Sequence, residues 1–354
     1  MTLEAADAEE STRSKPQKVD SDDDDEAESQ VVSAVDRVLD EWLVTGISRA
    51  AAKKFIRDKV GNRDATDCDR VRQWMLLRMN GKVWNHGYKD MVYAPENVPG
   101  LRSHHVWSRS DLPWLQQVEE HFPAILQELF AARDSSGASG FQPYRDPPHA
   151  GAEERAAQDG LGVEGVDRGM WNVLYLLLNH KTFEENCERF PVTIKAIEKA
   201  FPRSYSHAFF SALTPGSHIL KHKGPSNRML RVWLPLCGLD GFRLRVADTY
   251  VEPKAGEAFA WDHSYEHEAW HEGTETRVVL IVDIWHPDLT DAEVRFLRML
   301  QNCRLRAGRL LTEQVERNPE DVTYFDIVEK AKHLLTDDDW WVINSERDPS
   351  TKPT

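Results

Sequence analysis

The feature that most restricts the fold is a series of short β-rich runs between residues 205 and 285, separated by turn residues. The runs are His207–Leu213, Arg228–Cys237, Phe242–Val246, Thr249–Val251, Glu257–Trp261, Glu268–Trp270 and Thr276–Trp285. The turns between them are rich in glycine and proline, as in Thr214-Pro215-Gly216. Strands this short at this spacing predict an antiparallel sandwich or a closed jelly-roll barrel.

Apolar residues at helical spacing flank this β-rich region on both sides. We expect helices within residues 31–80, Pro113–Ala132, Thr182–Phe201 and 290–345. Pro123 is expected to kink or split the second of these helices. The stretch Asp134–Gly165 is rich in Gly, Pro, Ser and charge, and is expected to be a loop with little core. The pattern as a whole indicates an α+β fold with a jelly-roll core flanked by helices.

Negative charge is concentrated at the start of the chain. Residues 1–30 hold eleven acidic and three basic side chains, a net charge of −8, so the remainder carries −7 of the total of −15. Such a tail cannot bury enough apolar surface to offset its ordering entropy, so we expect it to be disordered. The mildly acidic remainder lacks the basic face that phosphate binding requires, so nucleic acid is not an expected partner.

The cysteines and the apolar runs indicate where the protein resides. The four cysteines are scattered, form no metal-knuckle pattern and are expected to be reduced thiols. No signal peptide opens the chain, and no apolar run approaches the ~20 residues that span a bilayer. We therefore expect a soluble, cytoplasmic protein without a transmembrane segment.

Two of the fourteen histidines stand where a metal site would be expected. His222 follows the strand-like Ser217–Leu220, and His267 stands just before Glu268–Trp270. A jelly roll can bring two such positions together at one end of the barrel. The common iron site is a His-x-Asp/Glu…His triad, but the residue two positions after His222 is Gly224, so water would take the third place. From spacing alone, this interpretation ranks no higher than a pair of unrelated histidines.

Two arginines lie within otherwise apolar strands. Arg277 shares one face of its run with Asp283, and Arg231 shares one face of its run with Trp233. A guanidinium on an apolar sheet face is costly unless it is paired, and it pairs best with a carboxylate. A dicarboxylate cosubstrate in the barrel would supply that anion. An ion pair of Arg277 with Asp283 or with a loop carboxylate is an equally good alternative.

Four motifs in order make a family resemblance visible. They are Phe210–Ile219, His222-Lys223-Gly224-Pro225-Ser226-Asn227, Trp261–Trp270 and the strand that ends in Asp283-Ile284-Trp285-His286-Pro287. Across residues 98–290 this arrangement resembles the aspartyl/asparaginyl β-hydroxylase family, whose pattern runs PGTH, HxGPxN, (D)DSxEHxxW and VDxWHP.

The resemblance implies a double-stranded β-helix (jelly-roll, cupin-like) that uses Fe(II), 2-oxoglutarate and O2. It also implies that the catalytic iron has two protein ligands, His222 and His267. The implied cosubstrate-binding residues are Ser211 and Arg277 for the distal carboxylate, with Arg231 as a second anion-binding group. Well-studied members have a histidine two residues after the Arg231 position, where this chain has tryptophan, so the cosubstrate's second carboxylate would be held differently.

The expected organisation is an acidic tail (1–30), a helical extension (31–97), an oxygenase domain (98–290) and a second helical extension (291–354). We expect a 2-oxoglutarate-dependent dioxygenase that hydroxylates a C–H of a protein side chain, a peptide or amino acid, or an acyl chain, with succinate and CO2 as coproducts. The alternative is a non-catalytic scaffold, with a degenerate site, that binds 2-oxoglutarate or a partner. A cupin-like isomerase or hydrolase would need a third protein ligand.

Overall fold

The computed structural model describes residues 34–62, 64–134, 140–144, 165–179, 181–314 and 340–341, with the side chains of residues 134 and 307–314 left aside. The tail expected to be disordered, most of the expected loop after Asp134 and the helical spacing past residue 314 lie outside these residues. No helix in this described part is both long and apolar enough to cross a membrane.

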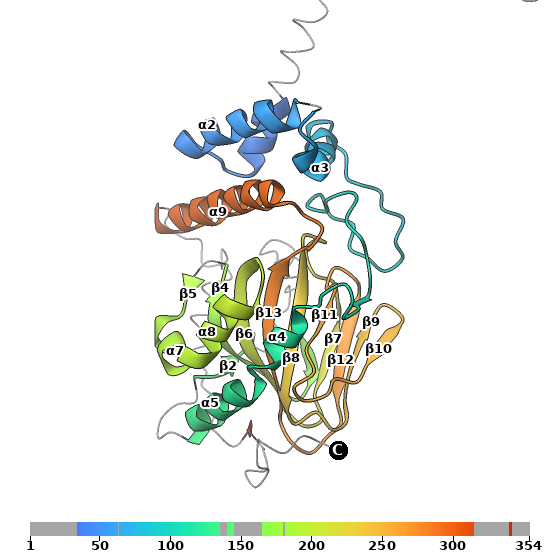
Figure 1. The fold of residues 1–354 in the computed structure, drawn as a ribbon, viewed down its shortest axis with the longest axis vertical. Helices are drawn as coiled ribbons and strands as arrows, with labels where there is room; N and C mark the ends of the chain where they lie inside the picture. Colours follow the sequence, from blue (N-terminus) through green and yellow to red (C-terminus); the bar gives the residue numbers. More distant parts are fainter. Residues whose placement is uncertain are drawn as a thin grey trace, which may run out of the picture.

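Two antiparallel sheets form the body of the protein (Figure 1). The larger sheet has the order β1-β11-β8-β13-β6-β4-β2, with β5 paired to β4. Its strands are β1 Val106–Trp107, β2 Gln142–Pro143, β4 Trp171–Leu178, β5 Lys181–Thr182, β6 Ser204–Leu213, β8 Met229–Cys237, β11 Phe259–Trp261 and β13 Arg277–Trp285. The smaller sheet, in the order β10-β9-β12-β7-β3, comprises β3 Val166–Arg168, β7 His218–His222, β9 Phe242–Val246, β10 Thr249–Val251 and β12 His267–His271. Each predicted run therefore overlaps a strand, whereas β1 to β5 are strands that the sequence analysis did not assign.

The two sheets pack face to face around one apolar interior. This interior joins Phe209 and Ile281 of the larger sheet to Leu244 and Ala269 of the smaller sheet. Strand β13 lies between β8 and β6, and its side chains alternate: Leu280 faces the helices, whereas its neighbour Ile281 faces the interior. The expected α+β fold, a double-stranded β-helix core flanked by helices, is confirmed.

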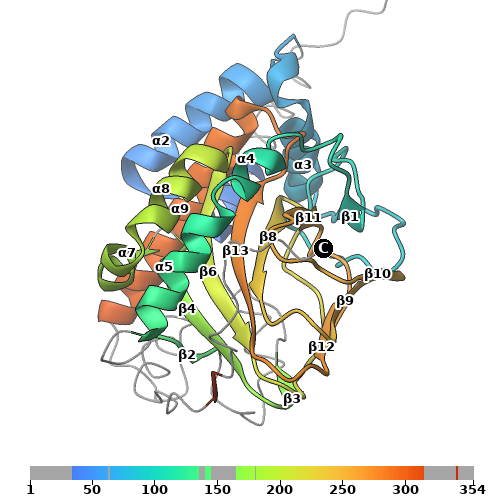
Figure 2. The ribbon, with the colours of Figure 1, turned by 60° about the horizontal axis from the view of Figure 1, so that its bottom comes forward.

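Helices cover the outer face of the larger sheet (Figure 2). They are α4 Leu115–Glu119, α5 Phe122–Asp134, α7 Glu184–Arg189 and α8 Pro191–Ala200. The predicted split at Pro123 is confirmed, because α4 ends at Glu119 and Pro123 lies in the first turn of α5, where its missing N–H costs nothing. Proline likewise opens α8, at Pro191.

A further layer of helices lies across one end of the barrel (Figure 1). It contains a helix at 34–41, α2 Gly46–Phe55, the π-helical turn Ile56–Val60, the 3-10 turn Thr66–Cys68, α3 Asp69–Met79 and α9 Asp291–Gln314. These segments share an apolar cluster that includes Trp74, Leu297 and Trp285 at the end of β13. Segments from the two expected extensions thus form a single layer although they are far apart in sequence.

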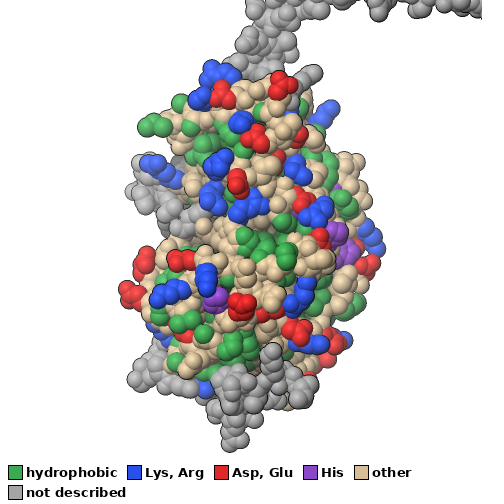
Figure 3. Space-filling model, viewed as in Figure 1, with side chains coloured by type: hydrophobic (Ala, Val, Ile, Leu, Met, Phe, Trp, Pro, Cys, Tyr) green, Lys and Arg blue, Asp and Glu red, His purple; other side chains and the backbone are tan. Residues whose placement is uncertain are grey.

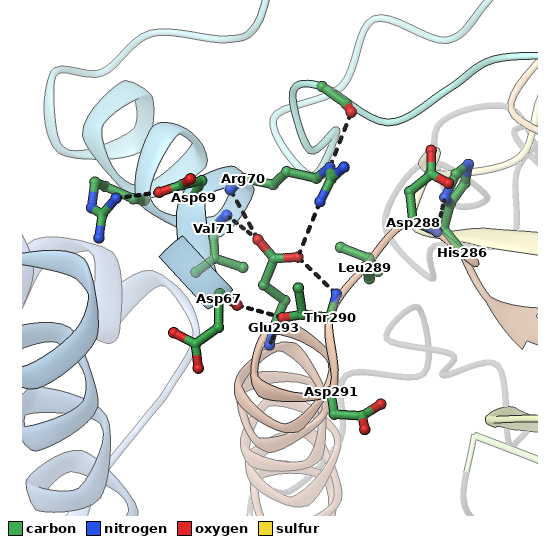
Figure 4. A network of polar contacts seen from close by, with 12 residues as sticks. Asp67, Asp69, Arg70, Val71, His286, Asp288, Leu289, Thr290, Asp291 and Glu293 are labelled. Carbon is green, nitrogen blue, oxygen red and sulfur yellow. Dashed lines mark hydrogen bonds and ion pairs between the residues drawn. The ribbon is translucent and has the colours of Figure 1, made fainter. Parts of the chain in front are cut away.

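Glu293 joins the two halves of this layer through one buried carboxylate (Figure 4). Its Oε1 accepts hydrogen bonds from the backbone N–H groups of Arg70 (2.9 Å) and Val71 (3.2 Å), in the first turn of α3. Its Oε2 accepts from the backbone N–H of Thr290 (2.9 Å), whose Oγ1 accepts from the N–H of Glu293 (3.1 Å). This reciprocal pair is a capping box at the start of α9. One side chain therefore caps two helices.

Replacing Glu293 with alanine should destabilise the fold by roughly 2–4 kcal/mol, because two helix caps are lost and buried N–H groups lose their acceptor. Urea unfolding followed by circular dichroism measures the loss. Glu198→Ala, an exposed site on α8, is the matched control and should change stability by less than about 0.5 kcal/mol. Equal stabilities of the two variants would show that Glu293 does not connect the layer.

Candidate metal and cosubstrate site

His222 and His267 lie opposite each other beside a bulge in the smaller sheet, with their ring planes inclined at 61°. They are direct register partners on β7 and β12, and their ring centroids are 4.1 Å apart. Beyond this pair the register shifts, so that Ala269 pairs with Ile219, and the extra residue on β7 lets both His222 and Ile219 face the interior. Both histidines lie within strands, rather than after and before them as expected from the sequence.

The two histidines share one tautomer. The Nδ1 of His222 lies 2.7 Å from the carbonyl oxygen of Leu220, and the Nδ1 of His267 lies 2.7 Å from that of Tyr265. A carbonyl only accepts, so each Nδ1–H donates and each Nε2 carries the lone pair that a metal binds. Burial, followed by the charge of His222, holds the pKa of His267 well below its usual range, so its imidazole is neutral at neutral pH. The donor set therefore fits a metal ion that prefers imidazole, such as Fe(II).

His263 occupies the space beside Gly224. A Cβ added to Gly224 would lie 2.0 Å from the Cδ2 and 2.5 Å from the Nε2 of His263, which is buried. The backbone N–H of Gly224 also donates to the carbonyl of His263 (2.7 Å). Gly224 is not among the residues with positive φ, so the turn does not require its backbone freedom. Glycine is required here because the imidazole of His263 fills the volume that a side chain would take.

Arg277 is buried in the interior with a solvent exposure of 1%. Its Nη1 donates to the carbonyl (3.0 Å) and the Oγ (3.1 Å) of Ser211, and its guanidinium lies over the rings of Phe242 (4.5 Å) and Trp233 (5.4 Å). Its Nε has no hydrogen-bond partner, and no carboxylate of the described residues forms an ion pair with it. Burial lowers the pKa of Arg277 to about 9, which leaves it charged at neutral pH. Arg277 is thus a buried cation for which none of the described residues supplies an anion.

Arg231 differs from Arg277 because a carboxylate balances its charge. Its Nε and Nη2 donate to the two oxygens of Asp283 (2.9 and 3.1 Å), and His207 Nδ1 lies 2.8 Å from the same carboxylate. Burial alone would raise the pKa of Asp283, but Arg231 and His207 bring it well below its usual range. The alternative in which Arg277 pairs with Asp283 is therefore wrong. The role of Arg231 as a second anion-binding group stays a prediction.

The hydroxyl group of Ser211 can donate a hydrogen bond to a ligand. Its Oγ accepts hydrogen bonds from Arg277 and from the Nε1 of Trp171 (2.9 Å), so its own hydrogen is directed elsewhere. It lies on β6 directly opposite Val279 of β13, next to Arg277 on the interior face.

The structure thus brings the predicted site residues into one interior. His222 and His267 come from the smaller sheet, while Ser211, Arg231 and Arg277 come from the larger sheet. The motif histidine His218 lies elsewhere, stacked on Trp270 and 3.1 Å from Asp167.

The sequence analysis missed His263 and the N-terminal segment beside it. His263 stands at the second aspartate position of the (D)DSxEHxxW motif, which was a signal visible in the sequence. Next to it, Val92 N–H donates to Ser264 O (2.7 Å), and Glu266 N–H donates to Asp90 O (2.8 Å). A segment from the expected helical extension therefore borders the site.

Comparison with known proteins agrees with these motifs. A model of the aspartyl/asparaginyl beta-hydroxylase family matches residues 119–287. The predicted family resemblance is confirmed. The matched region contains Ser211, His222, Arg231, His267 and Arg277, whereas α2, α3 and α9 lie outside it.

The curated relatives include hydroxylases of two kinds. Aspartyl/asparaginyl beta-hydroxylase of Homo sapiens is 32% identical over 136 residues, which cover 37% of this chain and 18% of that protein. Ornithine lipid ester-linked acyl 2-hydroxylase of Rhizobium tropici is 30% identical over 185 residues, covering 51% of this chain and 60% of that protein. Aspartate beta-hydroxylase domain-containing protein 2 of Xenopus tropicalis is 28% identical over 221 residues, which cover 58% of this chain and 57% of that protein. The chain therefore spans less than two thirds of the length of each.

Removing either histidine of the facing pair should abolish stoichiometric metal binding. His222→Ala and His267→Ala should each weaken Mn(II) binding by more than about 100-fold, beyond the 10–100-fold typical of an outer-sphere residue. Calorimetric titration with Mn(II) measures this. His218→Ala is the matched control, because His218 lies on the same strand but contacts Asp167 and Trp270 instead. Unchanged Mn(II) affinity in His222→Ala or His267→Ala would show that the pair is not the metal site.

The imidazole of His263 fills the space beside Gly224, so it determines how a carboxylate introduced at residue 224 affects stability and metal binding. Gly224→Asp should lower stability by about 1–3 kcal/mol and weaken metal binding, because the new Cβ collides with the imidazole. The double variant Gly224→Asp/His263→Ala removes the obstacle and should bind Mn(II) more tightly than His263→Ala alone, since a carboxylate then stands at the triad offset. Thermal unfolding and Mn(II) titration of all three variants test this. Wild-type stability in Gly224→Asp would contradict the packing described.

Proposed function

We propose that this chain is an Fe(II)- and 2-oxoglutarate-dependent dioxygenase that hydroxylates a C–H bond. The observation that carries the proposal is the buried guanidinium of Arg277, which has no carboxylate partner among the described residues and shares one interior with two facing imidazoles. A dicarboxylate that also binds a metal matches both requirements at once. The family match and the relatives named as hydroxylases support the same conclusion.

Each residue has a distinct role in this proposal. His222 and His267 would hold the iron through their Nε2 atoms, while Leu220 O and Tyr265 O fix the ring orientations. Arg277 and Ser211 would bind the distal carboxylate, with Arg277 held in place by its bonds to Ser211 and its contact with Phe242. When bound, iron and 2-oxoglutarate supply the oxidation, in which O2 is consumed, 2-oxoglutarate yields succinate and CO2, and the substrate gains a hydroxyl group.

The aromatic surroundings of the site would exclude water. Trp261 packs 4.6 Å from the His267 ring, Trp233 packs 5.6 Å from Trp261, and both are buried. A dry interior strengthens the attraction between Arg277 and a carboxylate.

The substrate belongs to one of the classes suggested by the sequence: a protein side chain, a peptide or amino acid, or an acyl chain. The names of the human and Rhizobium relatives span a protein hydroxylase and a lipid hydroxylase. Acidic and basic side chains are interspersed on the face in Figure 3, so this face offers no continuous basic surface for nucleic acid. We place the protein in the cytoplasm, where its four free cysteines would stay reduced.

A non-catalytic binding protein is the second candidate, favoured by Trp233 and by the pairing of Arg231 with Asp283. Succinate production with the iron-loaded protein and its substrate separates the two, because a scaffold would bind 2-oxoglutarate without turnover. A cupin-type isomerase or hydrolase lacks support, since the described residues contain no group of three or more His, Cys, Asp or Glu side chains able to hold a metal.

Arg277→Met should weaken 2-oxoglutarate binding by roughly 30-fold or more, because a charge-assisted interaction of about 2–3 kcal/mol is lost while the apolar stem is kept. Anaerobic calorimetry on the Mn(II)-loaded protein measures the affinity. The ligand-free variant should be as stable as the wild type or more stable, since an uncompensated buried charge is removed. Wild-type affinity together with a lower melting temperature would show that Arg277 is structural.

A further inference from the structure

Trp233 lies between the two parts of the candidate site. The Arg277 guanidinium is 5.4 Å from the Trp233 ring, the Trp233 ring is 5.6 Å from that of Trp261, and the Trp261 ring is 4.6 Å from that of His267. His267 in turn faces His222 at 4.1 Å. A continuous row of buried side chains therefore leads from the unpaired cation to the imidazole pair, and two of its members are indoles.

Three N–H donors along this row have no hydrogen-bond partner in the described part of the chain: Arg277 Nε, Trp233 Nε1 and Trp261 Nε1. A buried donor without an acceptor destabilises the folded protein, because it has lost its hydrogen bonds to water and gained none in return. The indoles of Trp107 and Trp285 are also unpartnered among the described residues, but they lie in the other two apolar clusters, away from the candidate site. The grouping of these three donors, one on Arg277 and two on the indoles between it and the histidine pair, indicates a ligand rich in acceptors.

The chemistry of the indole restricts what that ligand is. An indole Nε1–H only donates and keeps its hydrogen at any physiological pH, unlike the histidine that well-studied family members have at this position. Arg231, the other group expected to bind the second carboxylate, already forms a bidentate pair with Asp283. Trp233 is thus a donor in the interior whose hydrogen bond is still to be made.

We propose that the indole N–H of Trp233 donates a hydrogen bond to a carboxylate oxygen of the bound cosubstrate and replaces the histidine of the family. This inference rests on the proposed function and extends it to a positioning residue specific to this chain. The indole would supply a donor to an anionic acceptor between Arg277 and the histidine pair.

The test removes the indole N–H of Trp233 and keeps an aromatic ring at that position. Trp233→Phe should weaken 2-oxoglutarate binding to the Mn(II)-loaded full chain by about tenfold, as expected for one hydrogen bond to a charged acceptor. Trp233→His, which restores a donor, should recover most of the affinity. The ligand-free melting temperatures of Trp233→Phe and Trp233→His should fall by similar amounts, because both lose part of a buried ring, so the difference in affinity between them reports the donor. Trp285→Phe, which loses an equally unpartnered N–H outside the row, is the matched control and should bind like the wild type.

The possible results separate this inference from the proposed function. Wild-type affinity in Trp233→Phe would overturn the role of Trp233, while 2-oxoglutarate binding by the wild type and its loss in Arg277→Met would leave the function standing. Weaker binding in Trp233→Phe without recovery in Trp233→His would indicate lost packing and also overturn the role. A wild-type protein that binds no 2-oxoglutarate would overturn both.

Discussion

The alternation of side chains along β13 is the constraint on which the rest of the structure depends. This strand pairs with β6 on one side and β8 on the other, so its two faces see different surroundings. Val278, Leu280, Val282 and Ile284 pack under the helices, whereas Val279 and Ile281 pack in the interior. Arg277 and Asp283 are separated from Val279 and Ile281 by an even number of positions, so all four side chains point to the interior face. A slip of one residue would turn these charges toward the apolar helices, so the same apolar pattern that builds the core fixes the position of the site.

The interior holds two arginines, and only one of them has a carboxylate partner among the described residues. Asp283 neutralises Arg231 with help from His207, which makes that pair part of the fold. Arg277 has only the oxygens of Ser211 and the faces of Phe242 and Trp233 as partners within the described residues. A buried pair of opposite charges is close to neutral for stability, whereas a buried single charge is expensive. The folded protein therefore maintains a costly cation in the same interior as the two imidazoles, and a bound dicarboxylate would offset that cost.

Much of the barrel could be predicted from the sequence because its strands are bounded by turn residues. The run at Thr249–Val251 matches β10 at both ends, and the faces of Arg231 and Arg277 followed from a period of two. Strand β4 could not be assigned, since Trp171–Leu178 is apolar apart from Asn172 and shows no alternation, which also suits a buried helix. The joint layer of α2, α3 and α9 was equally hidden, because contacts such as that of Glu293 with Arg70 span more than two hundred residues. Within the site, the reason for Gly224 required three-dimensional contact with His263.

The central claim is that one interior holds a metal at His222 and His267 and a 2-oxo acid that reaches to Arg277. Visible absorption spectroscopy of the full chain under anaerobic conditions tests it most directly. Adding 2-oxoglutarate to the Fe(II)-loaded protein should produce the charge-transfer absorption of a 2-oxo acid chelated to Fe(II), and succinate, which lacks the oxo group, should not produce it. Absence of that absorption under conditions in which both Fe(II) and 2-oxoglutarate are bound would contradict the account, because the two would then occupy separate places.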